Sequence, residues 1–257
     1  MRSIGGKVES DKGKYLDNEM SFYCRSRISI YWTGDVIKVM IGATSWQING
    51  SFLENIEHRG ENIQFCELLV YTWNSNTERT FIREIDDIRR QTKISVHLPT
   101  DKLEHVKNAY AFFKDREYLN ITIHPFMNFK EFADFYFSIT EGGKKISIEN
   151  LENDLFFEFC DYLKEETSNI KVTMDYGHLL FEKRSVEFFY ERFSGQITEI
   201  HFHGSNEKKA HVFPDQKTIK DFEKFSKNKK LSDDFPVCIE LFNLEEAKKV
   251  AATLKGK

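Results

Sequence analysis

Histidines and acids lie at or just beyond the ends of short apolar runs in this chain. Six of the eight histidines and three carboxylates share this placement. Imidazole and carboxylate groups together are typical ligands of divalent metal ions. Side chains at the carboxyl ends of successive parallel strands converge on one face of a barrel. The sequence therefore predicts a single metal-binding pocket, and a metalloenzyme. Its residues are His97, His124, Glu149, Asp175, His178, His201, His203, His211 and Glu240.

The elements that would position these residues alternate between strand and helix patterns. Predicted strands cover residues 36–44, 65–71, 94–98, 120–125, 145–150, 170–178, 198–204 and 236–242. Predicted helices cover residues 52–60, 79–91, 102–116, 129–139, 153–166, 184–194, 219–227 and 244–254. Eight such units favour the α/β class and a closed (β/α)₈ TIM barrel. An open doubly wound sheet is the alternative, but no glycine-rich GxGxxG turn follows the first strand.

Composition limits the domain organisation and the partners. The chain has 257 residues, of which 40% are hydrophobic and 30% charged, enough apolar material for one large core. Residues 1–35 are polar and weakly periodic, which predicts a partly disordered N-terminal extension, and residues 36–257 form the catalytic barrel. A net charge of −4 argues against duplex nucleic acid as a partner.

Cysteine use and hydropathy bear on location. The four cysteines are widely spaced and form no CxxC pair, so they indicate neither a disulfide framework nor a zinc finger. The first residues have no apolar stretch typical of a signal peptide, and no apolar run is long enough to span a bilayer. We therefore expect a cytoplasmic protein without a membrane partner.

The acids carry the strongest signal for metal. Glu149 and Glu240 each interrupt an apolar strand pattern, and Asp175 follows another. Three buried acids that meet without a cation would repel one another, and at least one would stay protonated. A divalent ion resolves that conflict. By contrast His58 and His105 lie in helical surface contexts and are expected to be structural.

Spacing suggests how the remaining residues act. Asp175 and His178 are three residues apart just past a strand, so both can turn toward the barrel mouth. His201 and His203 are two apart on one strand and point to the same side. One of these two histidines could bind metal while the other contacts substrate or orients a ligand.

The ordered series VHLP, IHP, IEN, MDYGH, IHFHG, AH and IEL resembles the xylose-isomerase-like barrel superfamily over about residues 37–255. It is most similar to the endonuclease IV branch, which includes AP endonuclease family 2. The resemblance implies a cluster of up to three zinc ions. His97, His124 and Glu149 would hold the first; Glu149, Asp175, His201 and Glu240 the second; His178 and His211 would belong to a third.

The chain departs from this pattern at one position. The branch has an acid two residues before the last histidine, where this chain has Lys209 before His211. An ammonium cannot bind a metal ion, so Lys209 is expected to contact substrate, as is His203. Asp215 or His203 could supply the missing ligand, or the site could be binuclear. We expect two or more divalent ions, which are zinc, iron or manganese.

Several reactions remain open at this stage. The resemblance implies a metal-dependent phosphodiesterase, in which one ion activates water and another stabilises the phosphoryl oxygens. Glu149 would bridge that pair, with His178 or His211 assisting the leaving group. The isomerase and epimerase branch needs only Glu149, Asp175, His201 and Glu240, so a sugar or sugar-phosphate isomerase is the alternative. A catalytically silent binding barrel is the third possibility.

The substrate expectation depends on the first strands. The segment IGATSW, followed by CELLVYTW and SVHLPTD, resembles the cobamide-remodelling phosphodiesterases of this superfamily. Those enzymes cut the nucleotide loop of corrinoids related to vitamin B12. The resemblance thus implies a small phosphodiester that contains a nucleotide as the partner.

Overall fold

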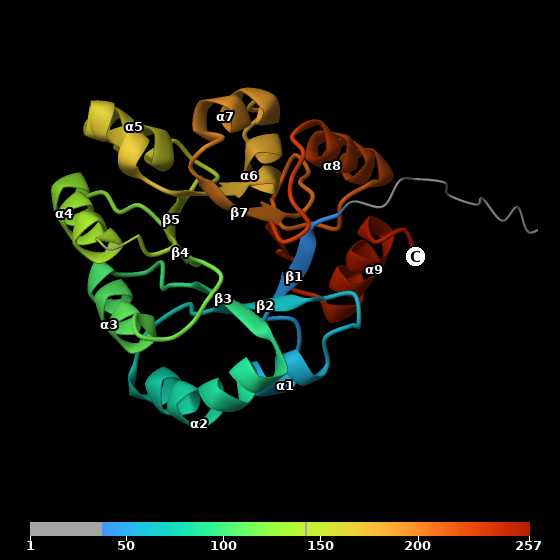
Figure 1. Cartoon of the computed structure of the whole chain (residues 1–257), viewed down its shortest axis with the longest axis horizontal. Helices are drawn as coiled ribbons and strands as arrows, with labels where there is room; N and C mark the ends of the chain where they lie inside the picture. Colours follow the sequence, from blue (N-terminus) through green and yellow to red (C-terminus); the bar gives the residue numbers. More distant parts are fainter. Residues whose placement is uncertain (1–37, 142) are drawn as a thin grey trace, which may run out of the picture. The chain divides into compact units, whose positions relative to one another are not determined.

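Eight parallel strands close into a barrel in which each strand pairs with the next along the chain and β8 pairs with β1 (Figure 1). This computed structural model describes residues 38–141 and 143–257; the predicted N-terminal extension, residues 1–35, lies outside the described residues. The strands are β1 Met40–Thr44, β2 Phe65–Leu69, β3 Lys93–His97, β4 Ile121–Ile123, β5 Ile146–Glu149, β6 Val172–Asp175, β7 Ile197–Phe202 and β8 Pro236–Ile239. The predicted (β/α)₈ barrel is confirmed, and the open doubly wound sheet is excluded.

Helices surround the barrel and connect the strands (Figure 1). They are α1 Phe52–Glu57, α2 Ser75–Gln91, α3 Leu103–Phe113, α4 Phe129–Thr140, α5 Leu155–Leu163, α6 Tyr176–Phe181, α7 Val186–Phe193, α8 Gln216–Asn228 and α9 Leu244–Leu254. A 3₁₀ turn, Lys164–Asn169, extends α5. The short α6 was not predicted: it starts directly after β6 and carries His178, which the sequence placed at the end of an extended run.

Most of these helices are preceded by a residue whose side chain accepts a hydrogen bond from the first turn. Asn74, Asn128 and Asn243 accept hydrogen bonds from backbone N–H groups in the first turns of α2, α4 and α9. Such caps satisfy donors that the helix itself cannot pair. Each of these helices thus begins at a defined residue soon after its strand, which limits the freedom of the loops at the barrel mouth.

Phenylalanines fill the layer between strands and helices. Phe81, Phe113, Phe132, Phe156 and Phe159 are fully buried, and neighbouring rings meet at edge or tilted angles. Each buried side chain of this size contributes about 1.5–3 kcal/mol to folding. These phenylalanines therefore pack the helices against the barrel.

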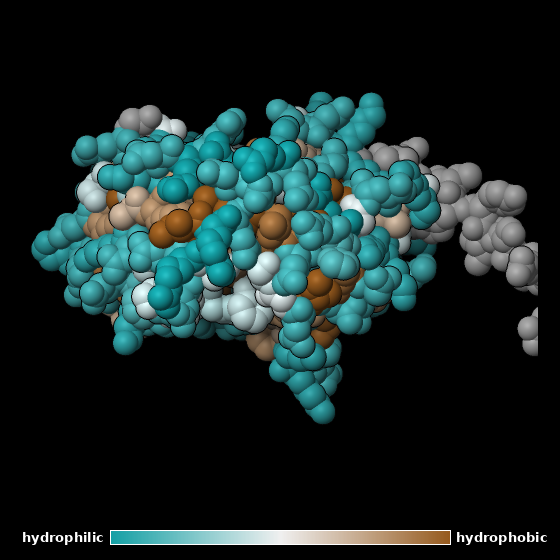
Figure 2. All heavy atoms as spheres, turned by 90° about the horizontal axis from the view of Figure 1, so that it is seen from below, coloured by the Kyte–Doolittle hydropathy of each residue, from teal (hydrophilic) through white to brown (hydrophobic). Residues whose placement is uncertain are grey.

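The face of the molecule seen in Figure 2 is mostly hydrophilic, with hydrophobic residues visible in small separate areas. No helix among the described residues is both long enough and apolar enough to cross a membrane.

The interior of the barrel is unusually polar beneath its mouth. Hydrogen bonds cross between strands that are not neighbours: Ser95 donates to Glu199 over 3.1 Å, and the hydroxyls of Thr122 and Thr173 lie 3.0 Å apart. All four residues are fully buried. Branched apolar side chains dominate most barrels of this type. Here a hydrogen-bonded polar layer lies directly under the ends of the strands and supports the charged groups above it.

Candidate metal centre

Glu149, at the end of β5, is the centre of the site. One carboxylate oxygen lies 2.9 Å from Nε2 of His97 and 3.0 Å from Nε2 of His124. His97 ends β3 and donates its other ring N–H to the Leu98 carbonyl at 3.0 Å. That bond keeps Nε2 directed at Glu149, an orientation typical of metal-binding histidines. The three ligand atoms lie close enough to share one ion, as the first predicted set requires.

The second predicted set also comes together. Nδ1 of His201 lies 3.2 Å from the other oxygen of Glu149 and 3.2 Å from a carboxylate oxygen of Glu240. Asp175, whose side chain caps α6, completes the group at 4.0 Å from the same nitrogen. All four side chains are buried. Glu149 belongs to both sets, one oxygen facing each, which is the bridging position expected from the sequence.

Charge is balanced within this centre by the histidines. Burial alone would raise the pKa of Glu149, but the charge of His201 and hydrogen bonds from three histidines hold it well below its usual range. Burial alone would lower the pKa of His97, yet Glu149 raises it to about 9. His124 is different, since burial lowers its pKa. Imidazolium ions here occupy the role that a divalent cation would have.

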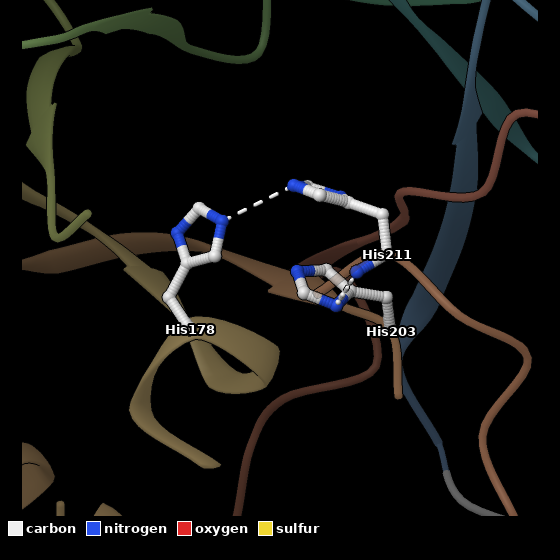
Figure 3. Close-up of side chains that lie close together, drawn as sticks. All are labelled: His178, His203 and His211. Atoms are coloured by element: carbon white, nitrogen blue, oxygen red, sulfur yellow. Dashed lines mark hydrogen bonds between the residues drawn. The ribbon is translucent and has the colours of Figure 1, made fainter. Parts of the chain in front are cut away.

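A third group consists of three histidines, from α6, from the position just after β7 and from the loop that follows (Figure 3). The Nε2 atoms of His178 and His211 face each other at 3.1 Å. Nδ1 of His178 lies 3.0 Å from the Asn150 carbonyl, and Nδ1 of His211 lies 3.3 Å from the Glu240 carbonyl. If both Nδ1 atoms donate to these carbonyls, two lone pairs face one another at Nε2. A cation between the two rings would remove that repulsion.

His203 ties this group to the second set. Its Nδ1 lies 3.0 Å from the backbone nitrogen of His211 (Figure 3) and 2.9 Å from the Gly204 carbonyl oxygen, and its Nε2 lies 3.1 Å from an Asp175 carboxylate oxygen. The ring packs so closely on Gly177 that a Cβ there would lie 2.1 Å from it. Glycine is therefore required in the DYGH segment. His211 itself has a φ of 52°, an uncommon conformation for a residue with a side chain.

The sequence suggested Asp215 or His203 as the ligand that replaces the acid missing at position 209, and only one of them lies in the cluster. His203 lies within the three-histidine group, whereas Asp215 caps α8 by accepting the Thr218 N–H at 2.7 Å and belongs to none of the candidate metal groups among the described residues. Lys209 is exposed in the loop between β7 and α8, where its backbone N–H donates to the Asn206 side chain. Lys209 is thus on the same loop as His211 but outside the cluster.

The remaining two histidines lie on the outside of the barrel. His58 is exposed at the end of α1, and His105 on α3 pairs with Asp101 at 2.8 Å. Neither belongs to the candidate metal groups of the described residues.

Sequence reasoning missed three acids of the site. Glu67 and Glu199 are fully buried, and Glu67 lies 3.1 Å from Nε2 of His201, on the opposite side of that ring from Glu149. Burial and the charge of Glu67 raise the pKa of Glu199 to about 8. Glu152 lies 3.5 Å from Nε2 of His178 at the pocket edge. Glu199 precedes His201 and His203 at strand periodicity, and Glu67 interrupts an apolar strand as Glu149 does, so both signals were present.

Several buried polar atoms of the site have no well-directed hydrogen bond, although some of them make close ionic contacts, as expected of groups that could bind cations. Among the described residues these include carboxylate oxygens of Glu67, Glu199 and Glu240, and Nε2 of His201. Above them a cavity of about 430 Å³ opens at the strand ends. It is lined by ligands of the predicted sets together with Tyr71 and Phe242. The donor set, imidazole with carboxylate, suits zinc, iron or manganese.

No family model and no curated protein sequence matches the chain. Solved structures do resemble it. An uncharacterized protein from Parabacteroides distasonis ATCC 8503 has a TM-score of 0.58 and 16% identity, covering 85% of this chain and 98% of that one. An AP endonuclease of family 2 from Brucella melitensis has a TM-score of 0.55 and 14% identity, covering 83% and 96%. A sugar phosphate isomerase/epimerase from Parabacteroides distasonis ATCC 8503 has a TM-score of 0.51 and 12% identity, covering 84% and 97%. These likenesses agree with the predicted fold class, the (β/α)₈ TIM barrel.

Proposed function

We propose that this protein is a metal-dependent phosphodiesterase. The observation that carries the proposal is the presence of two adjoining ligand sets that share Glu149. Chemistry on a single ion needs only the second set. His97 and His124 would be surplus to such a site, yet both face Glu149 at hydrogen-bond distance. The structural likeness to an AP endonuclease of family 2 is in keeping with this reaction class.

The residues have separable roles in this proposal. Bound ions would lower the pKa of water and neutralise charge on the phosphoryl group. Glu149, Asp175 and Glu240 supply the negative charge that retains those ions. Where no third ion is bound, His178 or His211, which lie next to the half-exposed Glu152 at the pocket edge, would donate a proton to the leaving oxygen. Lys209, exposed on the loop between β7 and α8, would contact a substrate phosphate.

The three-histidine group would hold a third cation through His178 and His211. His203 supports it by holding the His211 backbone and the Asp175 carboxylate. A phosphodiester in the nucleotide loop of a cobamide is the substrate we propose. The cavity of about 430 Å³ would take the phosphodiester portion of that molecule, and the net charge of −4 argues against duplex nucleic acid.

A sugar or sugar-phosphate isomerase is the second candidate. It is supported by the complete set Glu149, Asp175, His201 and Glu240, which could hold one ion without the others. A solved structure of similar fold is a sugar phosphate isomerase/epimerase.

Metal content and product analysis separate the two. Protein purified without added ions should contain two or more tightly bound ions per chain, and incubation with a cobamide should release a cobinamide phosphate detectable by mass spectrometry. One loosely bound ion, with no hydrolysis of any phosphodiester under several metals, would contradict the proposal and favour the isomerase. Hydrolysis of other phosphodiesters with no cobinamide phosphate would remove only the cobamide assignment.

A further inference from the structure

Exposed aromatic side chains gather beside the metal cavity. Trp46 follows β1, Tyr71 follows β2 and Phe242 follows β8, three strands that are neighbours in the barrel. Their exposed fractions are 50%, 44% and 44%. Large apolar groups left in water at a concave surface are typical of ligand-binding sites.

The Trp46 ring is held in place although half of it is exposed. Its Nε1–H donates to the Leu69 carbonyl at 3.0 Å, and its edge meets the Tyr71 ring with 4.8 Å between centroids. Its loop is fixed from below, because the buried Asn55 side chain accepts the N–H groups of Gln47 and Ile48 at 2.9 and 3.0 Å. A rigid exposed ring loses little conformational freedom when a ligand stacks on it.

A second cavity, of about 460 Å³, lies under these rings. Its apolar wall includes Trp46, Ile48 and Phe52, and Asn49, Asn76 and Arg83 supply hydrogen-bonding groups. This volume is within the range of small-ligand sites. Leu69, Val70 and Tyr71 line both this cavity and the metal cavity, so the two adjoin at the end of β2.

We infer that this second cavity binds a planar heteroaromatic ring of the substrate, with the phosphodiester of the same molecule at the metal centre. The inference rests on the proposed function for the link to catalysis, but not for the binding itself. A flat bicyclic base can stack its face on one of the Trp46 and Tyr71 rings and meet the other edge-on, because the two rings are nearly perpendicular, and its polar edges can face the asparagines. A purine or a benzimidazole nucleoside has this chemistry, whereas a sugar phosphate alone has not.

Calorimetric titration of the full, chelator-treated chain tests the binding step without catalysis. Adenosine, benzimidazole and ribose 5-phosphate are the three probes. We expect adenosine or benzimidazole to bind, and ribose 5-phosphate to bind at least tenfold more weakly. Trp46→Ala and Tyr71→Ala should each weaken binding of the aromatic probe roughly tenfold, as expected for loss of one stacking partner. Trp46→Phe retains an aromatic face and should restore most of the affinity.

A matched control is available on α7. Phe188 is 68% exposed and lies on a helix outside both cavities, so Phe188→Ala should bind the probes like the unmodified chain. Failure of both aromatic probes to bind, or equal affinity in Trp46→Ala and the unmodified chain, overturns the inference. Adenosine binding that depends on Trp46 in a chain that hydrolyses no phosphodiester would retain the subsite and refute the proposed function instead.

Discussion

Replacing Glu149 with Gln tests whether the charge of Glu149 raises the pKa of His97 in chelator-treated protein. His97 is nearly fully buried, and its pKa is raised from 6.5 to about 9 mainly by the hydrogen bond and charge of Glu149, against the effect of burial. At about 1.36 kcal/mol for each pKa unit, the rise in the pKa of His97 corresponds to about 3 kcal/mol of stabilisation of the folded state. Glu149→Gln keeps the shape of the side chain and removes the charge responsible.

The sign of the pH effect follows from the direction of this pKa. A histidine whose pKa is raised in the folded state stabilises the fold fully below pH 6.5, and that stabilisation is lost as the pH rises through about 9. Chelator-treated protein should therefore lose about 3 kcal/mol more of its free energy of unfolding between pH 5.5 and 9.5 than Glu149→Gln does. Urea unfolding at several pH values measures both slopes.

A matched variant controls for general effects of pH. Glu152 contacts His178 at the pocket edge, 3.5 Å away, and is about half exposed. Glu152→Gln should leave the His97 contribution in place and keep most of the pH slope of the unmodified protein. Equal slopes for Glu149→Gln and the unmodified protein would refute the account of Glu149 as the group that holds the proton on His97.

Three further outcomes are expected. His97→Ala should remove one ion per chain and most phosphodiesterase turnover, as measured by elemental analysis and product release; full turnover would contradict a centre that uses both ligand sets. Gly177→Ala should destabilise the fold by about 1–3 kcal/mol, because its methyl group would overlap the His203 ring, and unchanged denaturant unfolding would contradict that contact. Removing metal with a chelator should lower the free energy of unfolding by about 3 kcal/mol relative to protein at a metal concentration one hundred times Kd, measured by urea unfolding, and an unchanged midpoint would argue against ion binding by the native centre.

Strand periodicity explains why so much of the site was predictable. Because side chains alternate along a strand, an acid or histidine that interrupts an apolar run must point into the barrel, and β5 and β7 show this for Glu149 and His201. The same rule applies to Glu199 and Glu67, which were overlooked because they lie deeper in their strands than the residues at the strand ends.

Local sequence was less informative where the chain leaves the strands. The pattern at residues 170–178 was read as one extended run, but the chain turns into α6 after Asp175, whose carboxylate caps the helix by accepting the His178 N–H. Such a cap competes with continued strand pairing, and spacing alone does not reveal which of them prevails. The turn determines that His178 faces His211 rather than the first ligand set.

The sequence by itself determined the eight alternating units and the residue types of both ligand sets, because hydrophobic periodicity and strand-end position are local properties; it favoured a closed barrel over an open sheet, and the structure decided between them. The tertiary structure decided which atoms meet. Closure of the barrel brings Glu149 between His97 and His201, each 52 residues away along the chain. It also places His203, rather than Asp215, beside His178 and His211, and brings the loops after β8, β1 and β2 together beside the metal centre. These contacts depend on the register and curvature of strands distant in the sequence.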